Sequence, residues 1–142
     1  MNIRVYKDDE FVFSIDNPER LASLVPDDEQ DEFVLDTDDF AAWKVEQRVK
    51  DVRSEAQRRM MVLLGARDAS HLDVLISNGS REAIRLLRKG PDNWTAKEKM
   101  RAVKLEALDV AIDDIRAASN ALEAERPVPE NFADEVHWET RS

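Results

Sequence analysis

The sequence predicts a mainly α fold of the α+β class, in which an N-terminal β-hairpin region precedes a helical body. β-branched and aromatic residues cluster in short segments before residue 36, and apolar residues recur at helical spacing from there to about residue 125. The helical body is expected to hold two long antiparallel helices with two short helices between them. We therefore expect three regions: a hairpin region with a linker over 1–36, a helical body over 37–126 and a proline-led tail over 127–142.

The first region is expected to form strands. Residues 2–6 and 11–15 are rich in β-branched and aromatic side chains, and the polar link between them suits a hairpin turn. Asn17 and Pro18 then start a short helical turn, because proline tolerates the first helical position. After an acidic linker, residues 33–35 either add a third strand or anchor the linker to the core.

A long helix is expected from about Asp38 to Gly65. Asp36 or Thr37 can cap its start, and Gly65 can end it in a left-handed turn. Its apolar side chains follow one another at steps of three and four residues, which places them on one face of a helix. This face consists of Val45, Val49, Val52, Ala56, Met60 and Leu63.

Two short helices are expected next. Ser70 can cap a helix over 71–76, and Ser80 can cap another over 81–89. Between them the dipeptide Asn78-Gly79 is typical of a chain break. Gly90-Pro91 is expected to stop the second short helix.

The second long helix is expected to run from Thr95 to about Glu125. Thr95 and Glu98 have the capping-box spacing, in which each side chain accepts a hydrogen bond from a free backbone N–H at the helix start. The apolar residues of this helix form two adjacent stripes, so its wide apolar face is expected to contact two neighbours. One stripe is Met100, Val103, Ala107, Ala111, Ile115, Ala118 and Leu122, and the other is Leu105, Leu108 and Ile112.

Charge is sorted into blocks along the chain. Residues 1–39 hold 13 acidic and 3 basic side chains, a net charge of −10, whereas residues 40–104 carry +7 and residues 105–142 carry −7. Like charges stay crowded only where water or an oppositely charged surface screens them. The sorting therefore indicates either that the chain folds back on itself or that it binds a charged partner. The total of −10 argues against direct binding of nucleic acid, whose phosphates would repel the chain.

The residue content gives little support to enzymatic activity. Cysteine is absent, and the two histidines, His71 and His137, lie in different segments. The carboxylates around Asp113 and Asp114 are interpreted as a solvated helix face, because no histidine accompanies them as in dinuclear carboxylate sites. No phosphate-binding glycine loop, secretory signal or membrane-spanning apolar run is found. We therefore expect no catalytic residue, no cofactor, no bound metal and no membrane contact.

Bulky aromatic residues are better candidates for function. Trp43 and Trp94 are interpreted as closing the ends of the helical core. Trp138 lies in the proline-led tail, where a lone indole either folds back on the core or anchors a partner. The candidate partner-binding residues are the tail residues Phe132, Val136 and Trp138 and the acidic residues Asp27, Asp28, Glu29, Asp31 and Glu32.

The C-terminal segment also resembles a known group of proteins. The run IDDIRAASNALEA over 112–124, then Pro127 and Pro129, then NFAD over 131–134 and Trp138 resemble the ending of small proteins encoded in the tail modules of tailed bacteriophages. The N-terminal hairpin layout is similar as well, although the tryptophan-rich repeats of the better-known fibre-assembly proteins are missing. The resemblance implies a tail or tail-fibre assembly protein, chaperone-like and without catalytic residues.

This resemblance implies a binding partner and a cellular location. The expected partner is another phage structural protein of the tail, baseplate or fibre, bound in the host cytoplasm during assembly or in the virion. The resemblance leaves open whether the protein is a transient chaperone or a permanent virion component, and whether it forms a homo-oligomer. The alternative function is an acidic inhibitor that imitates DNA, because residues 1–39 carry −10 and would fit the basic cleft of a nucleic-acid-processing host enzyme.

Overall fold

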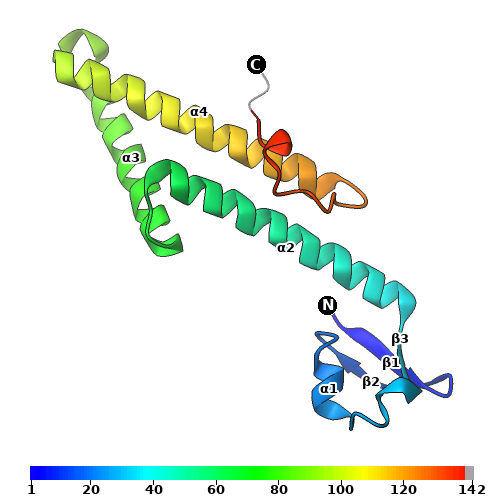
Figure 1. Ribbon diagram of the computed structural model, residues 1–142. Coiled ribbons are helices and arrows are strands. Elements are labelled where there is room, and N and C mark those ends of the chain that lie inside the picture. Colours follow the sequence, from blue (N-terminus) through cyan, green and yellow to red (C-terminus); the bar gives the residue numbers. More distant parts are fainter. Residues whose placement is uncertain (140–142) are drawn as a thin grey trace. The chain divides into compact units, whose positions relative to one another are not determined.

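The computed structural model describes residues 1–139 and confirms a mainly α fold with a small N-terminal antiparallel sheet (Figure 1). The last three residues of the predicted tail, 140–142, lie outside the described residues. The chain divides into two compact units, Met1–Lys50 and Asp51–Ser142. This division falls inside the long helix α2, Thr37–Leu64, so that one helix contributes to both units.

Unit 1 is built on a sheet with the strand order β2-β1-β3. Strand β1, Ile3–Lys7, pairs antiparallel with β2, Glu10–Ile15, and with β3, Phe33–Leu35, so residues 33–35 do form a third strand. The hairpin turns through Asp8 and Asp9, whose φ angles of 54° and 64° match the right-handed twist of the flanking strands. Short helix α1, Arg20–Leu24, and the 3-10 turn η1, Gln30–Glu32, connect β2 to β3.

One face of this sheet is the core of unit 1. Ile3, Val5 and Ile15 alternate with exposed residues along their strands and are buried, as the period of two predicts. The half-buried side chains packed against them come from the sheet, from α1 and from the start of α2: Phe13, Leu21, Phe33, Leu35, Phe40 and Trp43. Trp43 stacks on Phe40 with ring centroids 6.1 Å apart.

Arg4 joins β1 to the start of α2. Its guanidinium Nε donates to Asp39 Oδ2 at 2.8 Å, and its backbone N–H donates to the same oxygen at 3.0 Å. Asp36 acts as the predicted cap, since its Oδ1 accepts a hydrogen bond from the Asp39 backbone N–H at 2.9 Å. The helix therefore begins where the sequence placed it, and an ion pair links it to the sheet.

In unit 2 a single helix, α3, Ala69–Lys89, replaces the two short helices that we expected. Asp68 caps it rather than Ser70, since Asp68 Oδ1 accepts from the His71 backbone N–H at 2.7 Å. The predicted break at Asn78-Gly79 is wrong, because Gly79 lies inside the helix on the side that faces α4. Packing there outweighs the cost of about 1 kcal/mol that glycine imposes on a helix interior.

Helix α4, Ala96–Ala124, starts with the predicted capping box of Thr95 and Glu98. A 3-10 turn, η2, Pro91–Asn93, joins it to α3, and Trp94 closes this end of the unit by donating its indole N–H to the Leu86 carbonyl at 2.7 Å. Helix α4 runs in the direction opposite to the second half of α2, as predicted for the long helices (Figure 1). An ion pair between Arg53 and Glu123 joins α2 and α4.

The core of unit 2 lies between these helices and the C-terminal segment. Its buried apolar residues come from every helix of the unit and from the tail: Val52, Ala56, Leu72, Leu86, Ile112, Leu122, Val128 and Trp138. The tail ends in the 3-10 turn η3, Glu135–His137. None of the helices within residues 1–139 combines the length and apolar character needed to cross a membrane.

Candidate interaction surfaces

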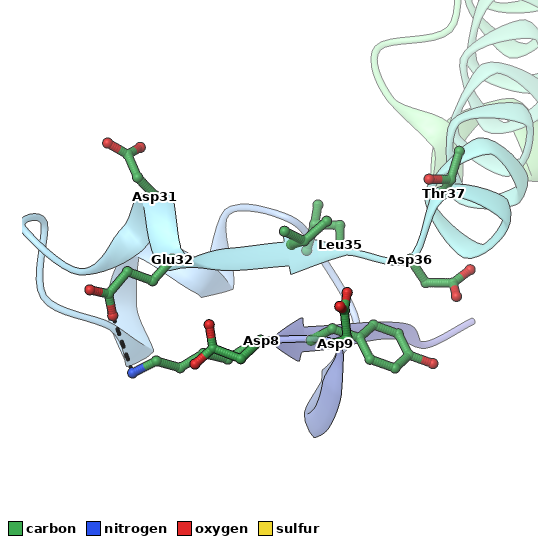
Figure 2. Close-up of a pocket in the computed structure, with 10 residues that line it drawn as sticks. Asp8, Asp9, Asp31, Glu32, Leu35, Asp36 and Thr37 are labelled. Carbon is green, nitrogen blue, oxygen red and sulfur yellow. Dashed lines mark ion pairs between the residues drawn. The ribbon is translucent and has the colours of Figure 1, made fainter.

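The first candidate surface is an acidic hollow on unit 1. Figure 2 shows it between the hairpin turn, the end of η1 and the start of α2. Five carboxylates line it: Asp8, Asp9, Asp31, Glu32 and Asp36. Lys7 is the basic residue of the lining, and its Nζ lies 3.1 Å from Glu32 Oε2. The hydrogen bond to Glu32 raises the pKa of Lys7 above its usual value.

The five acidic residues proposed as a docking strip lie at the surface, but they are not equally free. Asp27 Oδ1 accepts a hydrogen bond from Gln30 Nε2 at 3.1 Å, and Glu32 pairs with Lys7. The carboxylates of Asp28 and Asp31 take part in no hydrogen bond or ion pair within residues 1–139, and they are free to meet a basic partner.

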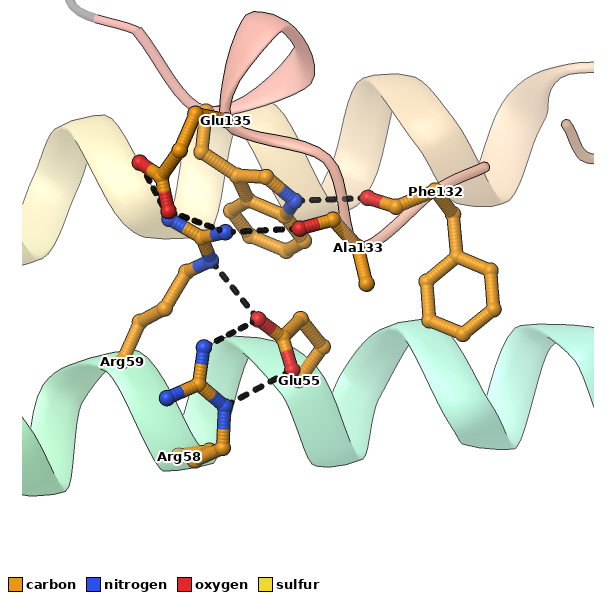
Figure 3. Close-up of polar contacts among 7 residues, drawn as sticks. Glu55, Arg58, Arg59, Phe132, Ala133 and Glu135 are labelled. Atoms are coloured by element: carbon orange, nitrogen blue, oxygen red, sulfur yellow. Dashed lines mark hydrogen bonds and ion pairs between the residues drawn. The ribbon is translucent and has the colours of Figure 1, made fainter. Parts of the chain in front are cut away.

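The second surface is the C-terminal tail, which is fastened to α2 through Arg59 (Figure 3). Arg59 Nη2 donates to the Ala133 carbonyl at 2.9 Å, and its Nη1 donates to Glu135 Oε2 at 3.1 Å. Its guanidinium carbon lies 4.8 Å from the ring centroid of Trp138, within cation–π range. We call this cluster around Arg59 and Trp138 the C-terminal latch.

Neighbouring charges hold Arg59 in place. Arg59 Nε donates to Glu55 Oε1 at 2.9 Å, one helical turn away, and Arg58 forms two more hydrogen bonds with the same carboxylate. Hydrogen bonding to Arg58 lowers the pKa of Glu55, and hydrogen bonding to Arg59 lowers the pKa of Glu135. Both acids therefore stay ionised below the usual range, and the latch keeps its ion pairs at neutral and mildly acidic pH.

Of the three tail residues proposed as a partner anchor, only Val136 points to solvent. Trp138 is 8% exposed and donates its indole N–H to the Phe132 carbonyl at 2.7 Å, so it folds back on the core instead of presenting its ring to a partner. The ring of Phe132 is half-buried and turned toward α2 (Figure 3). Val136 is 66% exposed. The burial of Trp138 has a simple cause, since its indole lies over a guanidinium that neighbouring carboxylates fix, and its N–H finds an acceptor within the tail.

Sequence reasoning missed Arg59. The only local signal was the spacing of Glu55 and Arg59, which suits an ion pair between adjacent turns of a helix. Its partners in the tail, Ala133, Glu135 and Trp138, lie more than 70 residues further along the chain, so no local pattern could identify them.

The third surface runs along the outside of α4. Its inner side is covered, because Ile112, Ser119 and Leu122 are buried. Its outer apolar side chains are not, and Met100, Val103 and Val110 are 76%, 69% and 53% exposed. The predicted wide apolar face is therefore uncovered at Met100, Val103 and Ala107, whereas its other members are buried or half-buried; Val110 was not part of the predicted face. We call the exposed row Met100, Val103, Ala107, Val110, Ala117, Ala121 and Ala124 the outer stripe.

The fourth surface is a shallow groove between α3 and the first turns of α4. Leu86 and Met100 supply its apolar lining, and most of its other lining residues are basic. Its two acids are already paired: Glu82 accepts two hydrogen bonds of 2.8 and 2.9 Å from Arg101, and Glu98 lies 2.6 Å from Lys89 Nζ. We call this surface the basic groove.

Three further basic side chains leave the basic groove with positive charge. Lys97 and Lys104 have no ion pair or hydrogen bond within the described residues. Arg85 forms no ion pair there either; its charge helps to lower the pKa of Glu82, but the hydrogen bond from Arg101 has the larger effect. The groove therefore combines an apolar floor with an unneutralised basic rim, which suits an acidic polypeptide segment.

Within residues 1–139, no group of three or more His, Asp and Glu side chains is arranged to hold a metal ion. Comparison of the chain with known protein families, with curated proteins and with solved structures finds no match.

Proposed function

We propose that this chain is a non-enzymatic assembly protein that binds another polypeptide through unit 2. One observation carries the proposal: unit 2 leaves large apolar side chains uncovered on α3 and α4 beside unpaired basic groups. Exposed apolar residues that occur singly need no explanation, whereas a set bordered by charge is typical of a protein-binding surface.

The basic groove is the proposed binding surface for this partner. A partner segment with an apolar residue flanked by acidic residues would place its apolar side chain on the exposed Met100, next to the buried Leu86. Its carboxylates would meet the rim cations Arg85 and Lys97. Complementary charge of this kind mainly raises the association rate and selects the partner, and the apolar contact supplies most of the affinity.

We further propose that the partner is a structural protein of a phage tail, baseplate or fibre. Only the resemblance of the C-terminal segment supports this part of the proposal. The latch adds a structural reason why the segment has its composition, because Trp138 holds the tail on Arg59 of α2 and the Phe132 carbonyl accepts its indole N–H. The tail thus supports the partner-binding unit rather than acting as a loose anchor.

The test is co-expression with each tail, baseplate and fibre polypeptide encoded beside this chain, followed by a binding measurement on any complex that co-elutes. The double variant Arg85→Glu and Lys97→Glu should raise the Kd at least tenfold. The matched control is Arg116→Glu, which reverses an exposed cation of α4 outside the groove and should leave the Kd unchanged. Absence of any complex, or equal effects of the groove and control variants, would contradict the proposal.

The acidic hollow favours a second candidate, the DNA-mimicking inhibitor. Asp31 lines the hollow and Asp28 lies three residues before it, and both present negative charge without neutralising partners within residues 1–139. An inhibitor of this class would lose its enzyme partner when Asp28, Glu29 and Asp31 are changed to Asn, Gln and Asn, and duplex DNA would compete with it. Its complex would also weaken steeply with added salt, whereas a complex held by apolar contacts in the groove would not.

A further inference from the structure

We propose that the outer stripe of α4 binds the outer stripe of a second copy of this chain, with the two helices antiparallel. This inference concerns self-association and does not depend on the partner proposed for the basic groove, although Met100 and Lys97 border both surfaces, so a second copy would compete with that partner for them. Three features of α4 carry it: the spacing of its uncovered apolar residues, the order of its charges and the position of its largest exposed side chains.

The spacing is that of a helix-pairing seam. Met100, Val103, Ala107 and Val110 follow at steps of three, four and three residues, and the alanines of the second half continue the same seven-residue repeat. Asp114 is the one charged residue on this row. Every other member is exposed, although the opposite face of the same helix is buried in unit 2. A seam of this regularity is the pattern that a second helix covers.

The charges beside the stripe select a second copy and its direction. The first turns of α4 carry the cations Lys97, Lys99 and Lys104, and the following turns carry Glu106, Asp113 and Asp114. None of these six side chains forms an ion pair or hydrogen bond within residues 1–139. In a parallel pair each charge would face the same charge of the other copy. An antiparallel pair instead places Lys97 and Lys99 against the turn of the other helix that carries Asp113 and Asp114. Lys104 and Glu106 lie near the middle of the overlap and do not distinguish the two directions.

The largest side chains set the alignment. Placing Met100 opposite Val110 of the second copy also places Val103 opposite Ala107, so that every layer at the centre of the seam is apolar. The same alignment brings Lys99 beside Asp113 of the second copy on one flank of the seam.

This alignment has a twofold axis near Leu105, so every contact occurs twice. The helices overlap over about 19 residues, from Ala96 to Asp114, or about 28 Å at 1.5 Å per residue. This overlap covers the first half of the outer stripe, and its last three alanines lie beyond the end of the other helix. Asp114 then lies at the first turn of the other helix, where the positive end of the helix dipole stabilises a carboxylate. The one charge on the stripe is thereby placed at the edge of the interface and not in its centre.

The first experiment is a mass measurement of the full chain by light scattering over a range of concentrations. We expect about twice the 16.3 kDa of one chain at high concentration and dissociation on dilution. The double variant Val103→Asp and Val110→Asp should raise the dimer dissociation constant at least tenfold. The matched control is Val62→Asp, at an exposed apolar position of α2, which should leave the dimer intact. Circular dichroism checks that each variant keeps its helices.

A second experiment tests whether the two helices are antiparallel or parallel. The chain has no cysteine, so single substitutions give unambiguous crosslinks. Met100→Cys mixed with Val110→Cys should give a crosslinked dimer with a short bismaleimide, and neither variant should crosslink by itself. Crosslinks of each variant with itself would indicate parallel helices and overturn the proposal.

A charge exchange completes the test. Lys99→Glu should weaken the dimer, because it places a second carboxylate beside Asp113 of the other copy, and adding Asp113→Lys in the same chain should restore the dimer. A chain that stays monomeric at about 1 mM, where even a weak complex of about −4 kcal/mol is half formed, would overturn the proposal. A dimer that is equally stable in the stripe variant and the Val62→Asp control would overturn it as well. Either result would leave the groove proposal intact, because the groove test alters different residues.

Discussion

The sharpest prediction concerns Trp138 and the C-terminal latch. Changing Trp138 to Ala removes an indole that is 8% exposed, together with its hydrogen bond to the Phe132 carbonyl and its stacking on Arg59. Tail residues should then leave α2, whereas α3 and α4 should stay helical, because the ion pair between Glu82 and Arg101 and the capping box of α4 do not depend on this side chain.

The expected magnitude follows from the burial and the contacts. Replacing a buried aromatic side chain by Ala costs about 3–5 kcal/mol when the site cannot collapse. A cation–π contact with a largely buried guanidinium accounts for about 1 kcal/mol of this, and a neutral hydrogen bond for about 1 kcal/mol. We therefore expect the tail to be held less tightly by about 3 kcal/mol, which is roughly a hundredfold change in its open fraction.

Amide hydrogen exchange followed by mass spectrometry measures this directly. The backbone N–H groups of His137 and Trp138 donate to carbonyls within the tail, and their exchange reports tail opening. Glu135→Gln is the matched control, because it weakens only an ion pair whose acidic partner is largely exposed and should change exchange little. Exchange in Trp138→Ala that stays within threefold of the unmodified chain would refute the role of the indole.

Three further predictions concern the helices and the sheet. Gly79→Ala should raise the free energy of unfolding, measured in urea, by about 0.5–1 kcal/mol, because alanine favours a helix interior and the added Cβ would lie 3.8 Å from the Leu105 side chain, an ordinary contact. Gly90→Ala should lower the free energy of unfolding, because Gly90 has a φ of 84°. Glu98→Gln should reduce the dependence of melting temperature on pH: Lys89 and the capping box lower the pKa of Glu98 from 4.5 to about 2, so its stabilisation is complete above pH 4.5 and is lost as the pH falls toward 2. Arg4→Met should lower the urea midpoint of unit 1, followed by fluorescence of Trp43, and an unchanged midpoint would show that the pair with Asp39 contributes nothing measurable.

Several features of the fold could be predicted because they depend on neighbours within a few residues. The hairpin, the caps of α2 and α4 and the extent of both long helices follow from turn chemistry, capping side chains and apolar periodicity, all of which act over three or four residues. The exposed acidic run at 27–32 was also predictable, because a dense run of carboxylates without nearby cations stays in water.

Other features depended on contacts between distant parts of the chain. The dipeptide at Asn78 and Gly79 favours a break by local propensity, yet packing against Leu105 keeps the helix continuous. The choice of Trp138 between core and solvent was decided by Arg59, which lies more than 70 residues earlier and has no local link to the tail.

The exposure of the outer stripe shows the same division. The sequence by itself determined that α4 is a helix with a wide apolar face, because the repeat of side chains is a property of the helix alone. Only the tertiary structure decided which side of that face is covered, because burial depends on where α2, α3 and the tail lie against it. Apolar periodicity indicates that a helix has a face suited to contact. The packing of distant segments determines which part of that face stays exposed and can bind another molecule.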